Sequence, residues 1–229
     1  PKPLTYIETH AGRGLYDLQD SAAVKTGEAA QGIGRLQAAL PVDHPYRRCL
    51  DAVRARYGDT AYPGSPLIAA QGLRAGDTLH LAELHPGEHA HLAATMAPFS
   101  AHVRKQDGFE LAHSLCPPTP RRGLMLVDPS YEVKADYDAI PRHLARIAKA
   151  WNVGILMLWY PILTPPRHDG MLAALRAAFP DAMRHEVPVA APRKGRGMVG
   201  SGLLVVNPPY GLEQETARIS RIFHAKSKA

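Results

Sequence analysis

The sequence predicts an α/β protein with a mostly parallel sheet and helices on both of its faces. Short apolar runs that end at a Gly, Pro or acidic residue alternate along the chain with segments of helical spacing. Uninterrupted apolar runs of this length indicate strands buried on both faces, and strands that alternate with helices form βαβ units. The expected strands are Leu4–Ile7, Thr78–Ala82, a weaker run just before Asp107, Gly123–Val127, Gly154–Trp159 and Gly202–Val206.

Two of the helices between these strands have a clear pattern. Apolar residues from Tyr137 to Trp151 recur at three- and four-residue steps, and basic residues are available for the opposite face. Met171 to Phe179 repeat the pattern more briefly. In a sheet built from such units, ligands bind beyond the carboxyl ends of the strands. The loops at those ends are therefore where chemistry is expected.

Two stretches depart from the alternation. Residues 15–62 carry helical pieces at Ala29–Leu40 and Arg47–Tyr57 and no clear strand, so we expect a helical insertion after the first strand. Near the end, His185–Val189 and Leu203–Val206 flank a Gly/Arg-rich loop, which predicts an antiparallel hairpin. We expect residues 1–229 to form a single domain.

Composition excludes several classes of protein. The 229 residues are 45% hydrophobic and 21% charged, which is ordinary for a packed globular protein and argues against a disordered scaffold. Cys49 and Cys116 lack metal-ligand spacing, which disfavours a zinc ribbon or a disulfide scaffold and fits a reducing cytoplasm. No apolar run approaches the roughly 18 residues of a membrane span. The net charge of +6 and pI of about 9.4 suit a polyanionic partner without requiring one.

Three segments at predicted strand ends could hold a nucleotide-like ligand. Gly12 and Gly14 follow the first strand, where glycines let the backbone approach a ligand closely. Their spacing is not G-x-G-x-x-G, which disfavours an NAD enzyme and suits a ligand without phosphates, such as S-adenosylmethionine. Glu83 could accept hydrogen bonds from ribose hydroxyls, and Asp107, before Gly108, from an adenine amine. The alternatives are a tight turn without a ligand at Gly12 and Gly14, a helix N-cap at Glu83 and a turn aspartate at Asp107.

The segment Asp128-Pro129-Ser130-Tyr131 carries most of the functional argument. It places an acid, a proline and an aromatic at the end of a buried strand, and is similar to the Asp/Asn-Pro-Pro-aromatic tetrapeptide of amino-group methyltransferases. An adenine amine is a poor nucleophile because its lone pair is delocalised into the ring. A carboxylate and a backbone carbonyl that accept its two hydrogens localise that lone pair, while the aromatic can stack on an extruded base.

A second copy, Asn207-Pro208-Pro209-Tyr210, matches the tetrapeptide more closely. Chain order favours Asp128, because in amino-group methyltransferases the turn that binds the methyl donor follows the first strand and the catalytic tetrapeptide usually follows the fourth. Asn207 follows the predicted hairpin at the far edge of the sheet. We therefore interpret it as a structural turn in which prolines end a strand.

With these residues in hand, the sequence resembles the bacterial 23S ribosomal RNA adenine-N6 methyltransferase family. The matching stretches fall in order along nearly the whole chain: residues 8–14, 62–68, 83–86, 107–109, 121–131, 158–161 and 201–210. The resemblance implies a Rossmann-like class I methyltransferase that uses S-adenosylmethionine without a metal and acts on 23S rRNA.

The resemblance also implies roles for individual residues. Asp128 is the expected catalytic acceptor, and Pro129 and Tyr131 complete its site. The expected donor contacts, besides the Gly12 turn, are His10, Ser65, Glu83, Asp107 and Gly108. The expected RNA contacts near the mouth of the site are Arg121, Arg122, Arg193, Lys194 and Arg196, although the last three also fit a solvated turn.

The chain departs from the family pattern in two respects. Ser130 replaces the second proline; the accepting carbonyl would come from Pro129, so we expect catalysis with a less rigid loop. Relatives carry an N-terminal segment, with a His that helps hold the donor, and a last strand after the region of Ile222. We expect both to be absent from this chain, and we expect a cytoplasmic monomer.

Two alternatives remain open at this stage. The same tetrapeptide serves DNA adenine-N6 methyltransferases, and sequence order does not separate the two substrates. A catalytically weak RNA-binding protein with the same fold would also show Ser130 and the shortened donor site.

Overall fold

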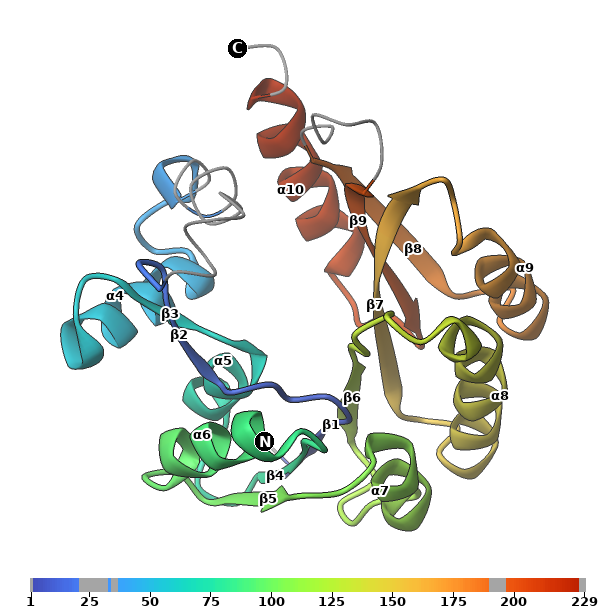
Figure 1. Cartoon of the computed structure of the whole chain (residues 1–229), viewed down its shortest axis with the longest axis horizontal. Helices are drawn as coiled ribbons and strands as arrows, with labels where there is room; N and C mark the ends of the chain where they lie inside the picture. The colour runs from blue at the N-terminus through green and yellow to red at the C-terminus, as the bar shows by residue number, and fades with distance from the viewer. Residues whose placement is uncertain (1, 21–32, 34–36, 190–196, 227–229) are drawn as a thin grey trace.

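A seven-stranded sheet forms the centre of the protein, which is described by a computed structural model over residues 2–20, 33, 37–189 and 197–226. The strand order is β5-β4-β1-β6-β7-β9-β8 (Figure 1). The strands are β1 (Thr5–Glu8), β4 (Thr78–Ala82), β5 (Ala101–Arg104), β6 (Gly123–Val127), β7 (Ile155–Thr164), β8 (Met183–Pro188) and β9 (Gly197–Val206).

The sheet has a topological switch point between β1 and β6. Strands β5, β4, β1, β6 and β7 run parallel, whereas β9 is antiparallel to both of its neighbours. From β1 the chain adds strands on one side as far as β5 and then returns to build the other side from β6. In open α/β sheets the crevice at such a point, at the carboxyl ends of the strands, is where ligands bind.

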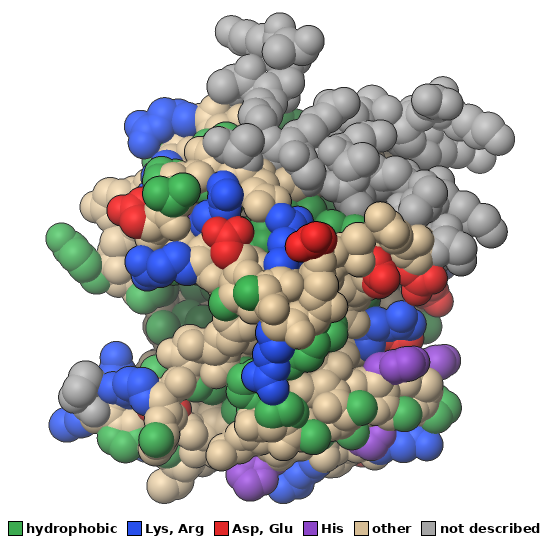
Figure 2. Space-filling view, turned by 90° about the vertical axis from the view of Figure 1, so that its left-hand side faces the viewer, with side chains coloured by type: hydrophobic (Ala, Val, Ile, Leu, Met, Phe, Trp, Pro, Cys, Tyr) green, Lys and Arg blue, Asp and Glu red, His purple; other side chains and the backbone are tan. Residues whose placement is uncertain are grey.

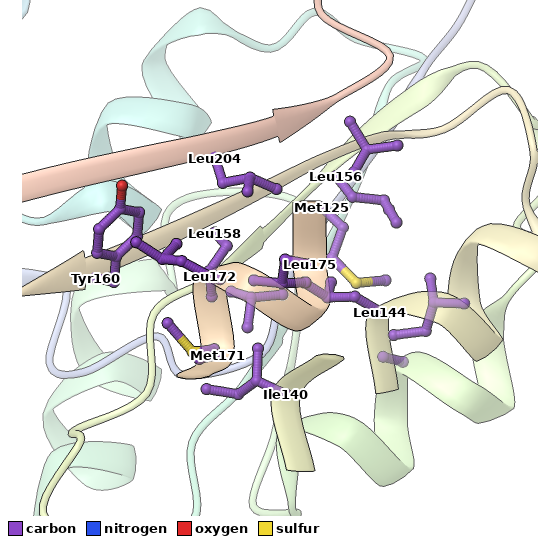
Figure 3. Close-up of a cluster of buried hydrophobic side chains, with 14 of the residues drawn as sticks. Met125, Ile140, Leu144, Leu156, Leu158, Tyr160, Met171, Leu172, Leu175 and Leu204 are labelled. Carbon is purple, nitrogen blue, oxygen red and sulfur yellow. The ribbon is translucent and has the colours of Figure 1, made fainter. Parts of the chain in front are cut away.

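Three helices cover one face of the sheet over β1, β6 and β7. They are α7 (Gly108–Leu115), α8 (Lys134–Ala150) and α9 (Asp169–Ala178). Alternate strand residues such as Met125, Leu156 and Leu158 point toward these helices and meet the apolar stripes of α8 and α9, represented by Leu144 and Leu175 (Figure 3). These side chains are at most 1% exposed, so this layer is the main core.

Separate groups of helices cover the other face. Helices α5 (Ser65–Gly72) and α6 (Pro86–Met96) pack over β1 and β4, where Leu79 and Leu81 meet Leu92. Helix α10 (Leu212–Lys226) lies along β8, and His185 of β8 is hydrogen-bonded to Ser220 at 2.8 Å. The central strands β6 and β7 are only half-buried on this face.

The structure confirms the strands predicted from apolar runs, the helices α8 and α9, and the antiparallel hairpin of β8 and β9. The predicted helix at Arg47–Tyr57 lies within α4 (Pro45–Tyr57). Much of Ala29–Leu40 lies outside the described residues, and Gln37–Ala39 forms a 3₁₀-helix, η1. The expected missing N-terminal segment and last strand concern chain beyond these residues and stay a prediction.

The expectation that residues 15–62 hold no strand was wrong. The two ends of this segment pair as an antiparallel ribbon of β2 (Leu15–Asp17) and β3 (Ala61–Pro63), with Tyr16 opposite Tyr62. Strands of three residues are too short for an alternating pattern to be recognised. The ribbon brings the end of the insertion back to the loop that follows β1.

Among the described residues no helix is long and apolar enough to cross a membrane.

Candidate active site

The loops that follow β1, β4, β5 and β6 meet at the switch point. The Thr9 N–H donates to the Leu126 carbonyl at 3.1 Å, which joins the loop after β1 to β6. The Ala11 N–H donates to the Ala82 carbonyl at 2.9 Å, which joins the same loop to β4. The sequence-predicted positions at residues 10–12, 83 and 128 therefore lie at one edge of the sheet.

The turn after β1 requires glycine. Gly12 and Gly14 have φ values of +60° and +77°, in the left-handed region that other residues rarely adopt. A side chain at Gly12 would also collide with the Tyr16 hydroxyl. We call residues 8–14 the donor turn.

Glu83 holds the donor turn in place. One carboxylate oxygen accepts the Gly12 N–H at 2.9 Å, and the other accepts the His85 N–H at 2.8 Å. A carboxylate has about four acceptor positions, so these two bonds leave capacity for further donors. The side chain is half-buried, which fits an acceptor beside a bound ligand as well as it fits a loop brace.

Asp107 and Gly108 begin helix α7 against the donor turn. The Asp107 carboxylate caps the helix by accepting the Glu110 N–H at 2.9 Å, which is the N-cap role that acidic residues favour. A Cβ at Gly108 would collide with the Thr9 carbonyl, so only glycine allows this contact. The His10 and Phe109 rings form a T-shaped pair with centroids 5.4 Å apart, and burial lowers the pKa of His10.

Asp128 follows β6 directly, at the switch point. It is half-buried, and within the described residues its carboxylate has no hydrogen-bond partner. Loss of solvent raises its pKa from 3.8 to about 7. An unpaired, poorly solvated carboxylate is well suited to accept hydrogens from a ligand.

The turn after Asp128 is rigidly packed. Pro129 is buried, and Tyr131 has a φ of +59° and is 7% exposed. The Tyr131 hydroxyl donates to the Trp159 carbonyl at 2.5 Å, and its ring contacts Tyr137 with centroids 5.1 Å apart. The ring that we expected to stack on a base therefore packs against neighbouring side chains in this structure.

Sequence reasoning missed Glu8, the last residue of β1. Its side chain is fully buried, and its two oxygens accept hydrogen bonds from the hydroxyls of Ser65 at 2.5 Å and Tyr6 at 3.0 Å. Burial raises its pKa to about 8. Ser65, an expected donor contact, thus directs its hydroxyl to Glu8. An acid directly before a Gly-rich turn was the available signal.

The expectation that Arg121 and Arg122 lie near the mouth of the site was wrong. Both precede β6, whereas Asp128 follows it, so they lie at the opposite edge of the sheet. The Arg122 carbonyl accepts the Thr5 N–H, and the Arg121 side chain donates to Asn152 at 3.1 Å. Their contacts are structural. Arg193, Lys194 and Arg196 lie outside the described residues.

In the same ranges of the chain, no group of three or more His, Cys, Asp or Glu side chains is placed to hold a metal ion.

Comparison with known proteins identifies the family of the chain. A family model described as Ribosomal RNA large subunit methyltransferase D, RlmJ, matches residues 1–227. The chain belongs to this family. The Ribosomal RNA large subunit methyltransferase J proteins of Escherichia coli K12 and Haemophilus influenzae Rd are 38% and 35% identical to it. These matches cover 98% and 95% of this chain and 82% and 80% of the relatives.

A solved structure of a Legionella pneumophila protein supports the same family fold. It superposes with a TM-score of 0.87 at 33% identity, over 96% of this chain and 82% of the other. As an RlmJ family member, the chain is a ribosomal RNA methyltransferase with a Rossmann-like sheet.

Proposed function

We propose that the protein transfers a methyl group from S-adenosylmethionine to the N6 amine of an adenine in 23S ribosomal RNA. The observation that carries this proposal is the Asp128 carboxylate, which follows β6 at the switch point beside β1 and has no hydrogen-bond partner among the described residues. Membership of the RlmJ family supports the ribosomal RNA substrate, and the tetrapeptide chemistry supports an adenine amine.

The residues around the donor turn fit S-adenosylmethionine, which supplies an electrophilic sulfonium methyl group. Glu83 retains acceptor positions for ribose hydroxyls, and Asp107 has a second carboxylate oxygen for the adenine amine. The left-handed glycines of the turn let its backbone approach the ligand. His10 and Ser65 border the same turn.

Asp128 activates the target amine by accepting one of its hydrogens, and the Pro129 carbonyl accepts the other. With both hydrogens held, the nitrogen lone pair points toward the methyl carbon and the new N–C bond forms as the C–S bond breaks. The bond electrons remain on sulfur, and the methylated amine then loses a proton to solvent. Ser130 is exposed, so the absent proline ring removes no buried contact.

Tyr131 supports the catalytic turn from its packed position. Its hydroxyl is bonded to the Trp159 carbonyl of β7, which fixes the end of the turn relative to the neighbouring strand. Stacking of this ring on a target base would require that hydrogen bond to break.

The protein would bind RNA as a cytoplasmic monomer. Basic side chains on the face formed by α4, α5 and α6 are interspersed with acidic ones (Figure 2). Ion pairs there include Arg13–Glu88, Arg47–Asp51 and Arg74–Asp77. Arg193, Lys194 and Arg196, which lie outside the described residues, are the proposed RNA contact.

Transfer of tritiated methyl groups from S-adenosylmethionine tests the proposal. We expect label in 23S rRNA and none in 16S rRNA or in adenine-containing duplex DNA, with N6-methyladenosine as the labelled nucleoside. Label in DNA alone would favour the DNA methyltransferase alternative. RNA binding without transfer would favour the catalytically weak RNA-binding protein.

A further inference from the structure

Glu8 is buried at the switch point and has no role in the proposed reaction. A fully buried carboxyl group is costly unless its oxygens are satisfied, and here two hydroxyls satisfy them. Tyr6 belongs to β1 itself, two residues earlier on the same side of the strand. Ser65 comes from the far end of the insertion, 57 residues later.

Ser65 connects Glu8 to the segment Tyr62-Pro63-Gly64-Ser65, where β3 ends and α5 begins. One residue before it, the Gly64 N–H donates to the Gly14 carbonyl at 2.8 Å. A Cβ at Gly64 would press on the Tyr16 ring, so the close approach depends on glycine. Two hydrogen bonds therefore tie this segment to Glu8 and Gly14, the first and last residues of the donor turn.

We propose that Glu8 is a positioning residue for methyl transfer: by binding the Ser65 hydroxyl it locks the end of the insertion onto the donor turn and fixes that turn beside Asp128. The inference rests on the proposed function, because the donor turn matters only if the donor binds there. It assigns Ser65 an indirect role, in which the hydroxyl shapes the site through Glu8.

The charge of Glu8 gives this role a measurable signature. The groups that face it are Tyr6 from β1, Ser65 from α5, Asp128 after β6 and Glu83 after β4. Burial is the largest cause of the raised pKa of about 8, the two acids raise it further, and the two hydroxyls lower it. Glu8 is therefore mostly uncharged at neutral pH. Above about pH 8 it gains a charge in this buried position beside Asp128, and the cost of burying that charge favours release of the donor turn from the insertion.

Calorimetric titration with S-adenosylmethionine at pH 7 and pH 9 tests the inference without RNA. For the wild type we expect affinity to fall about ten-fold between these values, as a single group of pKa near 8 ionises. Glu8→Gln keeps an uncharged group of the same shape, so we expect wild-type affinity at pH 7 and no loss at pH 9. Glu8→Ala and Ser65→Ala should weaken binding about ten-fold already at pH 7.

Glu186→Gln is the matched control, because Glu186 also accepts a tyrosine hydroxyl, from Tyr160 at 2.7 Å, but on edge strand β8. We expect it to retain the wild-type pH dependence. The inference alone would be overturned if Glu8→Gln lost donor affinity at pH 9 as the wild type does, or if Glu8→Ala bound the donor with wild-type affinity. Absence of donor binding by the wild type would overturn the donor assignment and the inference together, whereas binding without transfer to rRNA would overturn only the proposed substrate.

Discussion

Two similar tetrapeptides lie at opposite edges of the same sheet. Asp128 to Tyr131 follow β6, and Asn207 to Tyr210 follow β9. Each contains a residue other than glycine with a positive φ, +59° at Tyr131 and +54° at Asn207. The second tetrapeptide has both prolines and is the better match to the family pattern, yet it lies far from the donor turn.

Strand direction accounts for the difference. Because β9 is antiparallel to β7, Val206 pairs with Leu156, and Asn207 reaches the edge where the parallel strands begin. Its amide donates to the carbonyls of Asn152 and Gly154 at 3.0 and 2.8 Å, so its hydrogens are occupied. Tyr210 is fully exposed. The Asp128 carboxylate, by contrast, lies at the switch point and accepts no hydrogen bond from any residue that the structure describes. The direction of the preceding strand therefore places the two copies at opposite edges of the sheet, and only the first lies beside the donor turn.

The largest expected effect is on Asp128. Asp128→Ala removes the acceptor that activates the amine, so we expect kcat to fall about a thousand-fold, as for loss of a preorganised electrostatic group. Donor affinity should change little, because none of the described contacts that hold the donor turn involves Asp128. Single-turnover methylation and calorimetry measure the two quantities. A kcat near that of the wild type would remove Asp128 from catalysis.

Replacement of Tyr131 and of Tyr210 should have very different effects on the free energy of unfolding. Tyr131 is packed and hydrogen-bonded, so Tyr131→Ala should lower the free energy of unfolding by about 3 kcal/mol. Tyr210→Ala removes an exposed ring and should change it by less than about 0.5 kcal/mol. Urea unfolding measures both variants. Equal effects would mean that the two turns are packed alike, contrary to the comparison.

Protonation of Asp128 should make kcat fall at acidic pH. Its pKa is raised to about 7, and only the carboxylate accepts an amine hydrogen, so kcat should fall about ten-fold per pH unit below pH 7. The contribution of Asp128 to the free energy of unfolding changes with pH in the opposite direction. A carboxyl whose folded-state pKa is raised contributes stability that is lost as pH rises through about 7.

Asparagine provides the control for this profile, since Asp128→Asn cannot titrate. We expect its residual activity to be independent of pH between about 6 and 8. An unchanged acidic limb would assign the titration to another group.

The smallest expected effect on turnover is at Asn207. Asn207→Ala removes two hydrogen bonds and places alanine at a positive φ, so we expect the free energy of unfolding to fall by about 2 kcal/mol. The kcat should stay within about two-fold of the wild type, because the residue lies at the other edge of the sheet. Inactivation of a folded Asn207→Ala protein would contradict the comparison.

Much of the fold and the position of Asp128 could be predicted from sequence, whereas the choice of the catalytic tetrapeptide stays a prediction. Apolar runs gave the strand positions, and the order of the chain placed Asp128 at the carboxyl end of a parallel strand. Arg121 and Arg122 were misplaced because they are close to Asp128 in sequence, whereas a strand of five residues separates them in space. Strand direction alone places both arginines at the edge of the sheet where the parallel strands begin.

Other features depend on contacts that sequence does not reveal. The hydrogen bond between Glu8 and Ser65 joins residues 57 positions apart, and no local pattern specifies it. The packing of Tyr131 depends on a rotamer and on the carbonyl of Trp159, a residue of the neighbouring strand. The ribbon of β2 and β3 is too short to leave a periodic signal.

The most direct test compares methylation of 23S rRNA by the wild type, Asp128→Ala and Asn207→Ala under identical conditions, with the labelled nucleoside identified. We predict amounts of N6-methyladenosine within about two-fold of each other from the wild type and Asn207→Ala, and about a thousand-fold less from Asp128→Ala. Activity in Asp128→Ala together with its loss in a folded Asn207→Ala would contradict the assignment of catalysis to the switch point.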